Sequence, residues 1–259
     1  HLLPPTDLQA GDGSEERVVR LVWDNNSAVA DSTHIYRDGS PLDVISASRT
    51  EYADATSGPG TEHSYRIYQR SDAPGRSGDI ETTGFRVFLS PEDVEASKGG
   101  FEEKVELTWI DASRAEEGYR IYRSQTGSDV TDLIAELDKN TTSYADTEGI
   151  SVGAEYTYTV VPFDAYGESS SAQDTGFTVL QPPASVQAST DYEGEIVVSW
   201  NDASSVNTGY HVTRNGDLME SELEADATSF VDTTAPEAYT EYEYCISTQA
   251  TDANTAFIC

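Results

Sequence analysis

The sequence lacks the motifs that mark most enzymes and has few residues of several reactive types. Its 259 residues include three lysines, two cysteines and four histidines. No G-x-S-x-G nucleophile turn, no phosphate-binding G-x-x-x-x-G-K-[ST] loop and no zinc-binding H-E-x-x-H pair occurs. The histidines are scattered, and none stands at metal-ligand spacing from a cysteine or another histidine. The sequence therefore predicts a protein that is not an enzyme and that carries no cofactor.

Positive charge and long apolar runs are also scarce. Fifteen Lys and Arg residues against 47 Asp and Glu residues give a formal net charge of −32. Such a surface repels the phosphates of nucleic acids and of anionic lipids. No apolar run approaches the roughly 20 residues of a membrane-spanning helix, and no leader with a charged and then an apolar part is seen. We expect neither nucleic acid binding nor direct membrane insertion.

Calcium is a separate question because carboxylate oxygens are abundant. The acidic stretches at 90–96, 189–195 and 224–234 have no EF-hand pattern of alternating ligands and glycine. Weak, diffuse calcium binding is expected, without a defined metal site. The acidity rises along the chain, since residues 1–88 carry −6 and residues 89–180 and 181–259 carry −13 each.

The two cysteines, Cys245 and Cys259, both lie in the last fifteen residues. They are either two buried thiols or a disulfide that closes a terminal hairpin, and the disulfide is favoured. It would imply an oxidising compartment. Two N-x-[ST] sequons, at Asn25 and Asn140, fall in predicted loops, where a glycan would be tolerated.

What the sequence does contain is a threefold internal repeat. Trp23, Trp109 and Trp200 are 86 and 91 residues apart. Other landmarks keep the same spacing, among them the openings "PPTDLQA" (4–10), "SPEDVEA" (90–96) and "PPASVQA" (182–188) and the later "TEYADAT" (50–56), "TSYADTE" (142–148) and "TSFVDTT" (228–234). A period near 90 residues suits a small domain copied in tandem. We predict domains at 1–88, 89–180 and 181–259, the last with a short or truncated final strand.

Within each repeat the pattern is that of strands. The stretches 104–110 and 155–161 alternate apolar or aromatic residues with polar ones, and turn residues separate such stretches every eight to twelve positions. About seven short strands a repeat predict an all-β fold of three tandem antiparallel β-sandwiches. Proline-containing junctions predict a semi-rigid rod, about 90–100 Å long if each sandwich is roughly 30 Å.

The repeats resemble fibronectin type III domains. The resemblance covers essentially the whole chain, and it rests on the opening proline, the strand-B tryptophan, the strand-C "GYRIYR" (118–123) and the strand-F "TEY" element. It implies that the three tryptophans are core residues and that Tyr156 and Tyr242 are tyrosine-corner residues, whose hydroxyls bond to nearby backbone. His63 stands at the corner position of the first repeat, where an imidazole replaces the hydrogen bond but not the full apolar area.

Two further sets of repeated residues have structural interpretations. Arg37, Arg123 and Arg214 stand at one aligned position near a strand end, where an ion pair is favoured over an anion site. Tyr36 and Tyr122 are predicted on the outer face of their sheet, where contact with arginine stems is favoured over ligand binding.

The function predicted from these features is a non-enzymatic, extracellular or cell-surface array that spans distance or assembles into a filament or surface layer. Two alternatives stay open: a spacer module of a secreted polysaccharide-degrading enzyme, and a receptor ectodomain fragment that binds a protein. The expected partners are proteins or further copies of the chain, with carbohydrate as another class. Exposed edge strands would allow a neighbouring strand to add to a sheet.

Overall fold

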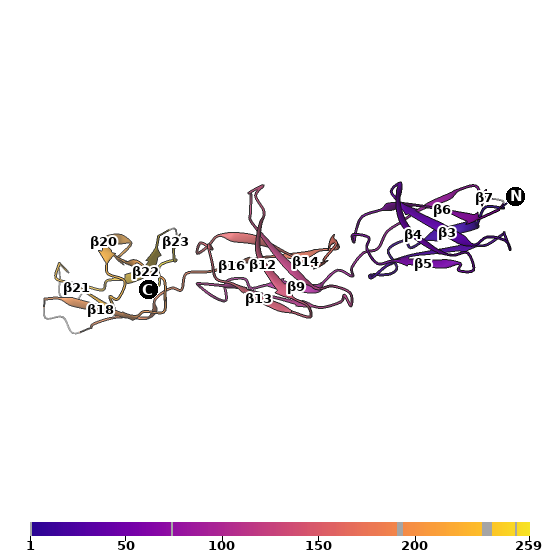
Figure 1. Ribbon diagram of the computed structural model, residues 1–259. Helices are drawn as coiled ribbons and strands as arrows, with labels where there is room; N and C mark the ends of the chain where they lie inside the picture. Colours follow the sequence, from indigo (N-terminus) through magenta and orange to yellow (C-terminus); the bar gives the residue numbers. More distant parts are fainter. Residues whose placement is uncertain (1, 74, 191–193, 235–239, 252) are drawn as a thin grey trace.

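The structure is a computed structural model that describes residues 2–73, 75–190, 194–234, 240–251 and 253–259. Within these ranges the chain forms no helix, and therefore no helix that could cross a membrane. Its strands make six antiparallel sheets, two in each of three successive β-sandwiches. The sandwiches follow one another end to end, which gives the elongated shape predicted from the repeats (Figure 1).

The first domain packs a three-stranded sheet, in the order β1-β2-β5, against a five-stranded one, in the order β4-β3-β6-β7 with β8 also paired to β6. Its strands are β1 Thr6–Ala10, β2 Val19–Asp24, β3 Ser32–Arg37, β4 Ser40–Ser46, β5 Glu51–Asp54, β6 His63–Ser71, β7 Gly75–Arg76 and β8 Ile80–Gly84.

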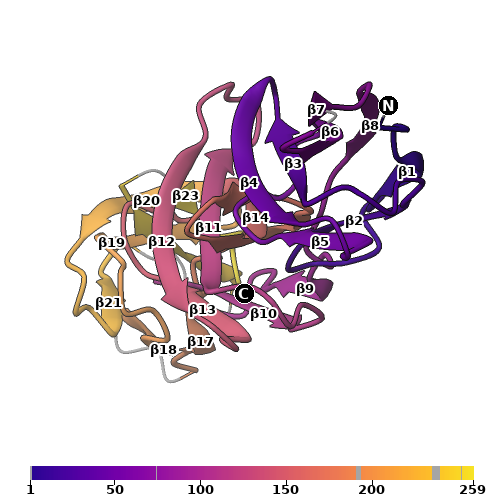
Figure 2. The ribbon, with the colours of Figure 1, turned by 45° about the vertical axis from the view of Figure 1, so that its right-hand side comes forward.

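The second domain repeats this arrangement, with the sheets β9-β10-β13 and β12-β11-β14-β15 and with β16 paired to β14. Its strands are β9 Glu92–Ala96, β10 Val105–Ile110, β11 Gly118–Gln125, β12 Asp132–Asp138, β13 Ser143–Asp146, β14 Glu155–Asp164, β15 Gly167–Glu168 and β16 Ala172–Phe177. The strands β4 and β12 lie at the edges of their sheets (Figure 2).

The third domain has the sheets β17-β18-β21 and β20-β19-β22-β23. Its strands are β17 Ala184–Ala188, β18 Ile196–Asn201, β19 Gly209–Arg214, β20 Asp217–Leu223, β21 Ser229–Asp232, β22 Tyr244–Ala250 and β23 Ala253–Asn254. The short β23 pairs only with Gln249 and Ala250 at the far end of β22.

Alternation along the strands builds each core. In β10, Val105, Leu107 and Trp109 are buried, and the residues between them are exposed. The same alternation in β2 and β18 buries Trp23 and Trp200, so all three tryptophans lie in the cores of their own domains. In the second and third domains a tyrosine packs against the indole, with ring centroids 5.6 Å apart for Trp109–Tyr119 and 5.3 Å apart for Trp200–Tyr210.

Candidate functional sites: buried ion clusters and domain junctions

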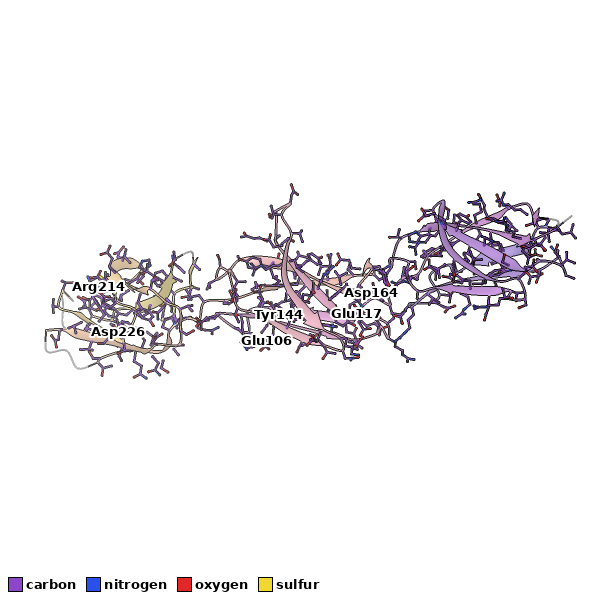
Figure 3. All side chains as sticks on the ribbon, viewed as in Figure 1. Glu106, Glu117, Tyr144, Asp164, Arg214 and Asp226 are labelled. Carbon is purple, nitrogen blue, oxygen red and sulfur yellow. A yellow bond between two sulfur atoms is a disulfide. The ribbon has the colours of Figure 1, made fainter. Side chains whose placement is uncertain are left out.

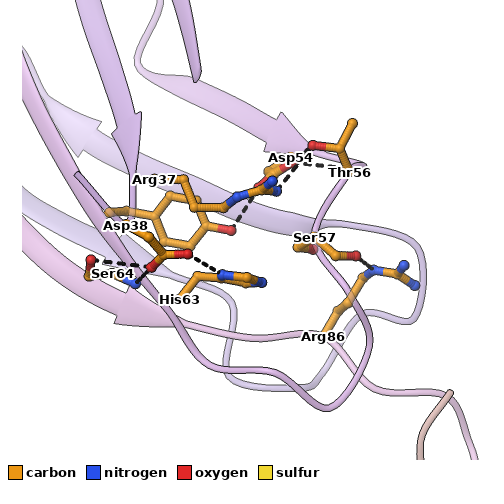
Figure 4. Close-up of polar contacts among 9 residues, drawn as sticks. Arg37, Asp38, Asp54, Thr56, Ser57, His63, Ser64 and Arg86 are labelled. Atoms are coloured by element: carbon orange, nitrogen blue, oxygen red, sulfur yellow. Dashed lines mark hydrogen bonds and ion pairs between the residues drawn. The ribbon is translucent and has the colours of Figure 1, made fainter. Parts of the chain in front are cut away.

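A buried ion cluster lies between the two sheets of the first domain (Figure 4). Arg37 at the end of β3 places its Nη1 atom 2.7 Å from Oδ2 of Asp54. The hydroxyl of the core residue Tyr65 donates to the same oxygen at 2.8 Å. The other oxygen, Oδ1, accepts from the backbone N–H and the hydroxyl of Thr56, at 2.9 and 2.8 Å. The Asp54 carboxylate thus accepts hydrogen bonds from β3, from β6 and from the loop that follows β5.

The same cluster recurs in the other two domains at aligned positions. The arginine–aspartate distance is 2.6 Å in both, and the tyrosine–aspartate distances are 2.9 and 2.7 Å. The residues are Arg123, Asp146 and Tyr158 in the second domain and Arg214, Asp232 and Tyr244 in the third. The ion pair predicted for the repeated arginines is confirmed, and its partner is the aspartate that ends the fifth strand of each domain.

These contacts change the acidity of the groups involved. Burial by itself raises the pKa of Asp232, but hydrogen bonds from Tyr244, Thr234 and Arg214 lower it to about 2. Burial and the bond to Asp232 raise the pKa of Tyr244 to about 12. The pKa of Asp54 is lowered in the same sense, because its hydrogen bonds outweigh its burial. Asp54 and Asp232 are therefore ionised whenever their domains are folded near neutral pH.

The sequence patterns alone assign these aspartates no role. Asp54, Asp146 and Asp232 each close an aromatic–small–aspartate triplet in an aligned landmark: "YAD", "YAD" and "FVD". The recurrence of this triplet at aligned positions is the feature of the sequence that could have identified the three aspartates. In a chain with 47 acidic residues, a repeated carboxylate does not by itself indicate a buried partner.

The predicted tyrosine-corner residues, Tyr156 and Tyr242, each lie beside the arginine of their own domain's ion cluster. The Tyr156 hydroxyl accepts from the backbone N–H of Ser151 at 2.9 Å, and the Arg123 guanidinium lies 5.2 Å from its ring centroid. Tyr242 has Arg214 at 5.3 Å in the same way, but the backbone position that corresponds to Ser151, residue 237, lies outside the described residues. In the first domain, His63 pairs through Nδ1 with Oδ2 of Asp38 at 2.6 Å, a side-chain partner in place of the upstream backbone (Figure 4).

The two sequons differ in their surroundings. The Asn25 side chain is fully used: Nδ2 donates to the carbonyls of Ala47 and Arg49, and Oδ1 accepts from Trp23 and Gln69. Glycosylation of Nδ2 would break two of these bonds, so we expect Asn25 to be a poor acceptor. Asn140 is exposed in the turn between β12 and β13, with a positive φ of 59°. A glycan at this position remains a prediction.

Cys245 and Cys259 form a disulfide across 14 residues, with an S–S distance of 1.98 Å. Next to it, Ile246 and Ile258 exchange both backbone hydrogen bonds, each 2.8 Å long. Within the described residues, these sulfurs and Glu243 make up the only cluster of three potential metal ligands. Sulfurs joined to each other are not thiolate ligands, so this cluster supplies no argument for a metal site.

The outer-face tyrosines contact charged side chains. The Arg66 guanidinium lies 4.2 Å from the Tyr36 ring centroid, as predicted for an arginine-covered ring. The Tyr122 hydroxyl instead donates to Glu168, which also pairs with Arg120 at 3.1 Å. Both rings are therefore engaged by their own domain.

The junction between the first and second domains is polar and tightly bonded. Glu16 of the first domain accepts from the Ser113 hydroxyl at 2.6 Å and from the backbone N–H of Arg114 at 3.3 Å, both in the second domain. It also accepts from the backbone N–H of Leu89 in the linker, at 3.1 Å. The neighbouring linker residue, Phe88, is only 1% exposed. A single carboxylate thus joins one domain, the linker and the next domain.

Glu102 makes the same set of contacts at the second junction. It accepts from the backbone N–H of Gln181 in the linker at 2.7 Å. It also accepts from the N–H and hydroxyl of Ser205 in the third domain, at 2.7 and 3.0 Å. Burial raises its pKa and these bonds lower it, and the net effect is a lowered pKa. Glu16 and Glu102 each stand seven residues before the tryptophan of their repeat. We call these two residues the junction glutamates.

The first junction has an additional ion pair. Arg86, 1% exposed, donates to the carbonyls of Ser57 and Glu16 at 2.8 Å each and to Oδ2 of Asp164 in the second domain at 2.6 Å. Asp164 lies where the two domains meet (Figure 3). At the second junction the position of Arg86 is taken by Thr178, so this ion pair has no equivalent there.

No protein-family model and no curated protein matches this sequence. Solved structures match it at low identity. A two-domain fibronectin type III segment of chicken tenascin is 19% identical, with 66% of this chain and 98% of that chain covered and a TM-score of 0.40. The central fibronectin-III array of RIM-binding protein is 18% identical (100% and 96% covered, TM-score 0.30), and the FN1–FN3 domains of chicken CNTN1 are 16% identical (98% and 96% covered, TM-score 0.30).

The fold assignment rests on the strand order itself. In every domain a sheet of the first, second and fifth strands faces a sheet built on the third, fourth and sixth. This is the sandwich that the sequence resemblance implies, with its tryptophan on the second strand. The chain therefore has the fold of three antiparallel β-sandwiches in tandem, each with the strand order of a fibronectin type III-like sandwich.

Proposed function

We propose that this chain is a non-enzymatic, extracellular structural array that holds the groups at its two ends a fixed distance apart. The observation that carries the proposal is the repeated junction, in which a junction glutamate binds the linker and the next domain in the same way twice. A linker that served only to connect would not need the same three-way contact at both junctions. The terminal disulfide supports an oxidising environment.

The acidic surface favours a spacer over a self-associating subunit at low salt. A net charge of −32 makes copies of the chain repel one another until ions screen them. Sedimentation of the chain from low to high salt, with and without calcium, tests this. We expect a monomer whose sedimentation does not depend on protein concentration. Growth into oligomers or fibres would overturn the spacer function and favour a filament or surface-layer subunit.

A further inference from the structure

The outer face of the larger sheet in the first domain carries a group of arginines. Arg70 on β6 and Arg76 on β7 are direct cross-strand partners, and both are exposed. Arg66 lies four residues before Arg70 on the same strand and therefore faces the same side of the sheet. Like charges placed opposite each other destabilise a pair of strands. The pairing of Arg70 with Arg76 thus has no explanation in the stability of the sheet. We call these three residues the arginine face.

The domain itself uses the arginine face only in part. Asp79 accepts from Arg66 through Oδ2 at 3.3 Å and from Arg76 through Oδ1. The Arg76 guanidinium also lies 3.9 Å from the ring centroid of Tyr68. Among the residues that the structure describes, the side chain of Arg70 has no hydrogen-bond or ion-pair partner. A guanidinium group has more N–H donors than these contacts use, so the face can bind a further anion.

The local charge of this face is positive although the chain is acidic. Three arginines stand beside two carboxylates, those of Asp79 and of Glu81, the cross-strand partner of Arg66. The neighbouring His34 senses the excess: burial lowers its pKa, and the charges of the two paired arginines lower it further. An anion placed on this face would therefore be attracted.

The corresponding face of the other two domains has no such excess of cations. In the second domain, Arg120 pairs with Glu136 at 3.0 Å and with Glu168 at 3.1 Å. The one base of residues 181–259 is Arg214, which belongs to a buried ion cluster. The arginine face is therefore a property of the first domain, and a structural role shared by all three domains does not account for it.

The side chains around the arginines indicate which kind of anion fits. Tyr68 is only 8% exposed, because its ring stacks on His34, with ring centroids 4.8 Å apart, and on Arg76. No ring face is left on which a sugar could stack. Val44, the cross-strand partner of His34, is 56% exposed on the same side. A polypeptide can offer both carboxylates and an apolar side chain to cover Val44, whereas an anionic polysaccharide has no apolar counterpart.

The spacing of the arginines sets the spacing of the carboxylates that they can bind. Arg66 and Arg70 are four residues apart on β6, which is about 13 Å along a strand. An extended segment that lies along β6 presents every second side chain to the sheet. Two acidic residues four positions apart would reach Arg66 and the Arg70–Arg76 pair, and the residue midway between them would lie over Tyr68.

We propose that the arginine face is a docking site for an extended acidic segment of a partner polypeptide. One carboxylate of the segment binds Arg70 and Arg76 and relieves their repulsion. A second carboxylate, four residues away, binds Arg66, and an apolar side chain between the two covers Tyr68 and Val44.

NMR titration of the full chain with short capped peptides tests the proposal. The probe is the pentapeptide ESVSE, which has the required spacing. The comparison peptides are EESSV, with the same composition but adjacent glutamates, and QSVSQ, without charge. We expect EESSV to bind about threefold to fivefold more weakly than ESVSE, from the loss of one ion pair, and QSVSQ at least about tenfold more weakly. Signals should shift at residues 34–36, 66–70 and 76, and added salt should weaken binding.

Two variants of the chain locate the site. Arg70→Gln removes a guanidinium without a partner in its own domain, so it should leave thermal unfolding unchanged and weaken the binding of ESVSE about fivefold. Arg49→Gln removes the same charge from the exposed loop between β4 and β5 and should leave binding unchanged.

Failure of ESVSE to bind, equal binding of EESSV, an equal effect of the two variants, or shifts elsewhere in the chain would overturn the proposal. Binding of heparin to these residues without binding of ESVSE would replace the polypeptide by an anionic polysaccharide. Self-association at low salt that Arg70→Gln abolishes would overturn the separate partner in favour of a second copy of this chain.

Discussion

The aspartate of each buried ion cluster is the residue through which a sandwich joins its two sheets. Asp54, Asp146 and Asp232 are each at most 1% exposed and each accepts from an arginine and a core tyrosine. A buried carboxylate is stable only with such partners, since removing them leaves an uncompensated charge. The cluster therefore constrains three positions in every repeat.

Substituting the tyrosine tests one of these contacts. Tyr65→Phe keeps the ring but leaves the Asp54 carboxylate with one fewer donor, and we expect it to lower the free energy of unfolding of the first domain by about 1–3 kcal/mol. Thermal unfolding measures the loss. Tyr36→Phe removes a hydroxyl from the outer face of the same sheet and serves as the control, with an expected change below about 0.5 kcal/mol.

Acid should weaken the third domain through Asp232. Its folded pKa of about 2 is below the ordinary value of 3.8, so the stabilisation is complete above pH 4 and is lost as pH falls toward 2. The difference corresponds to roughly 2 kcal/mol. Denaturant unfolding between pH 2 and pH 6 should show this loss, and Asp232→Asn should remove that part of the pH dependence. An unchanged profile in the variant would contradict the role given to this carboxylate.

Asn25 and Asn140 should respond differently to substitution. Asn25→Ala breaks four hydrogen bonds beside Trp23, and we expect a loss of about 1–3 kcal/mol in the first domain. Asn140→Ala lies on the surface and should change little apart from the cost of its positive φ. Expression in a glycosylating host, followed by intact mass measurement, should find no glycan on Asn25. A glycan there in the folded protein would show that the amide is accessible after all.

Among the elements, the C-terminal segment 253–259 depends most on one covalent bond, the disulfide between Cys245 and Cys259. The disulfide closes a loop of 14 residues, and a loop of this size is worth about 3 kcal/mol. In the double variant Cys245→Ser and Cys259→Ser, we expect hydrogen exchange at Ile246 and Thr248 to accelerate while the first two domains stay unchanged. Equal protection with and without the disulfide would mean that β22 holds the tail by itself.

The strands and the cores were largely predictable, because the same pattern occurs in all three repeats and each occurrence supports the other two. The alternation that buries Val105, Leu107 and Trp109 occurs three times at one spacing, so strands, cores and sandwich pairing follow from the sequence. Contacts between side chains far apart in sequence did not follow. The bond from Ser113 to Glu16 joins residues 97 positions apart, and no local periodicity marks it. The hydrogen bonds of the half-buried Asn25 side chain could not be predicted for the same reason, since its sequon suggests a free surface amide.

At the scale of the whole molecule, the junction glutamates fix how one domain follows the next. In Glu102 one oxygen accepts from Gln181 and the other from Ser205, so Glu102→Gln places an amide N–H₂ group against one of these two N–H donors and that half of the contact becomes repulsive. Glu16→Gln is milder, because Glu16 binds Leu89 and Ser113 through one oxygen, Oε2, which the amide oxygen can replace, and only the bond from Arg114 to Oε1 is lost. We expect the second junction to loosen more, because Arg86 and Asp164 still join the first.

Small-angle X-ray scattering of the wild-type chain and of the double variant Glu16→Gln and Glu102→Gln tests the central claim most directly. The matched control is Glu15→Gln with Glu106→Gln, neighbouring glutamates that pair with Arg20 and Lys104 within their own domains. For the wild type and the control we predict one extended rod, about 90–100 Å long from three sandwiches of roughly 30 Å. For the junction variant we predict a broad distribution of shorter shapes. Identical scattering from all three proteins would contradict the claim that these carboxylates set the shape of the array.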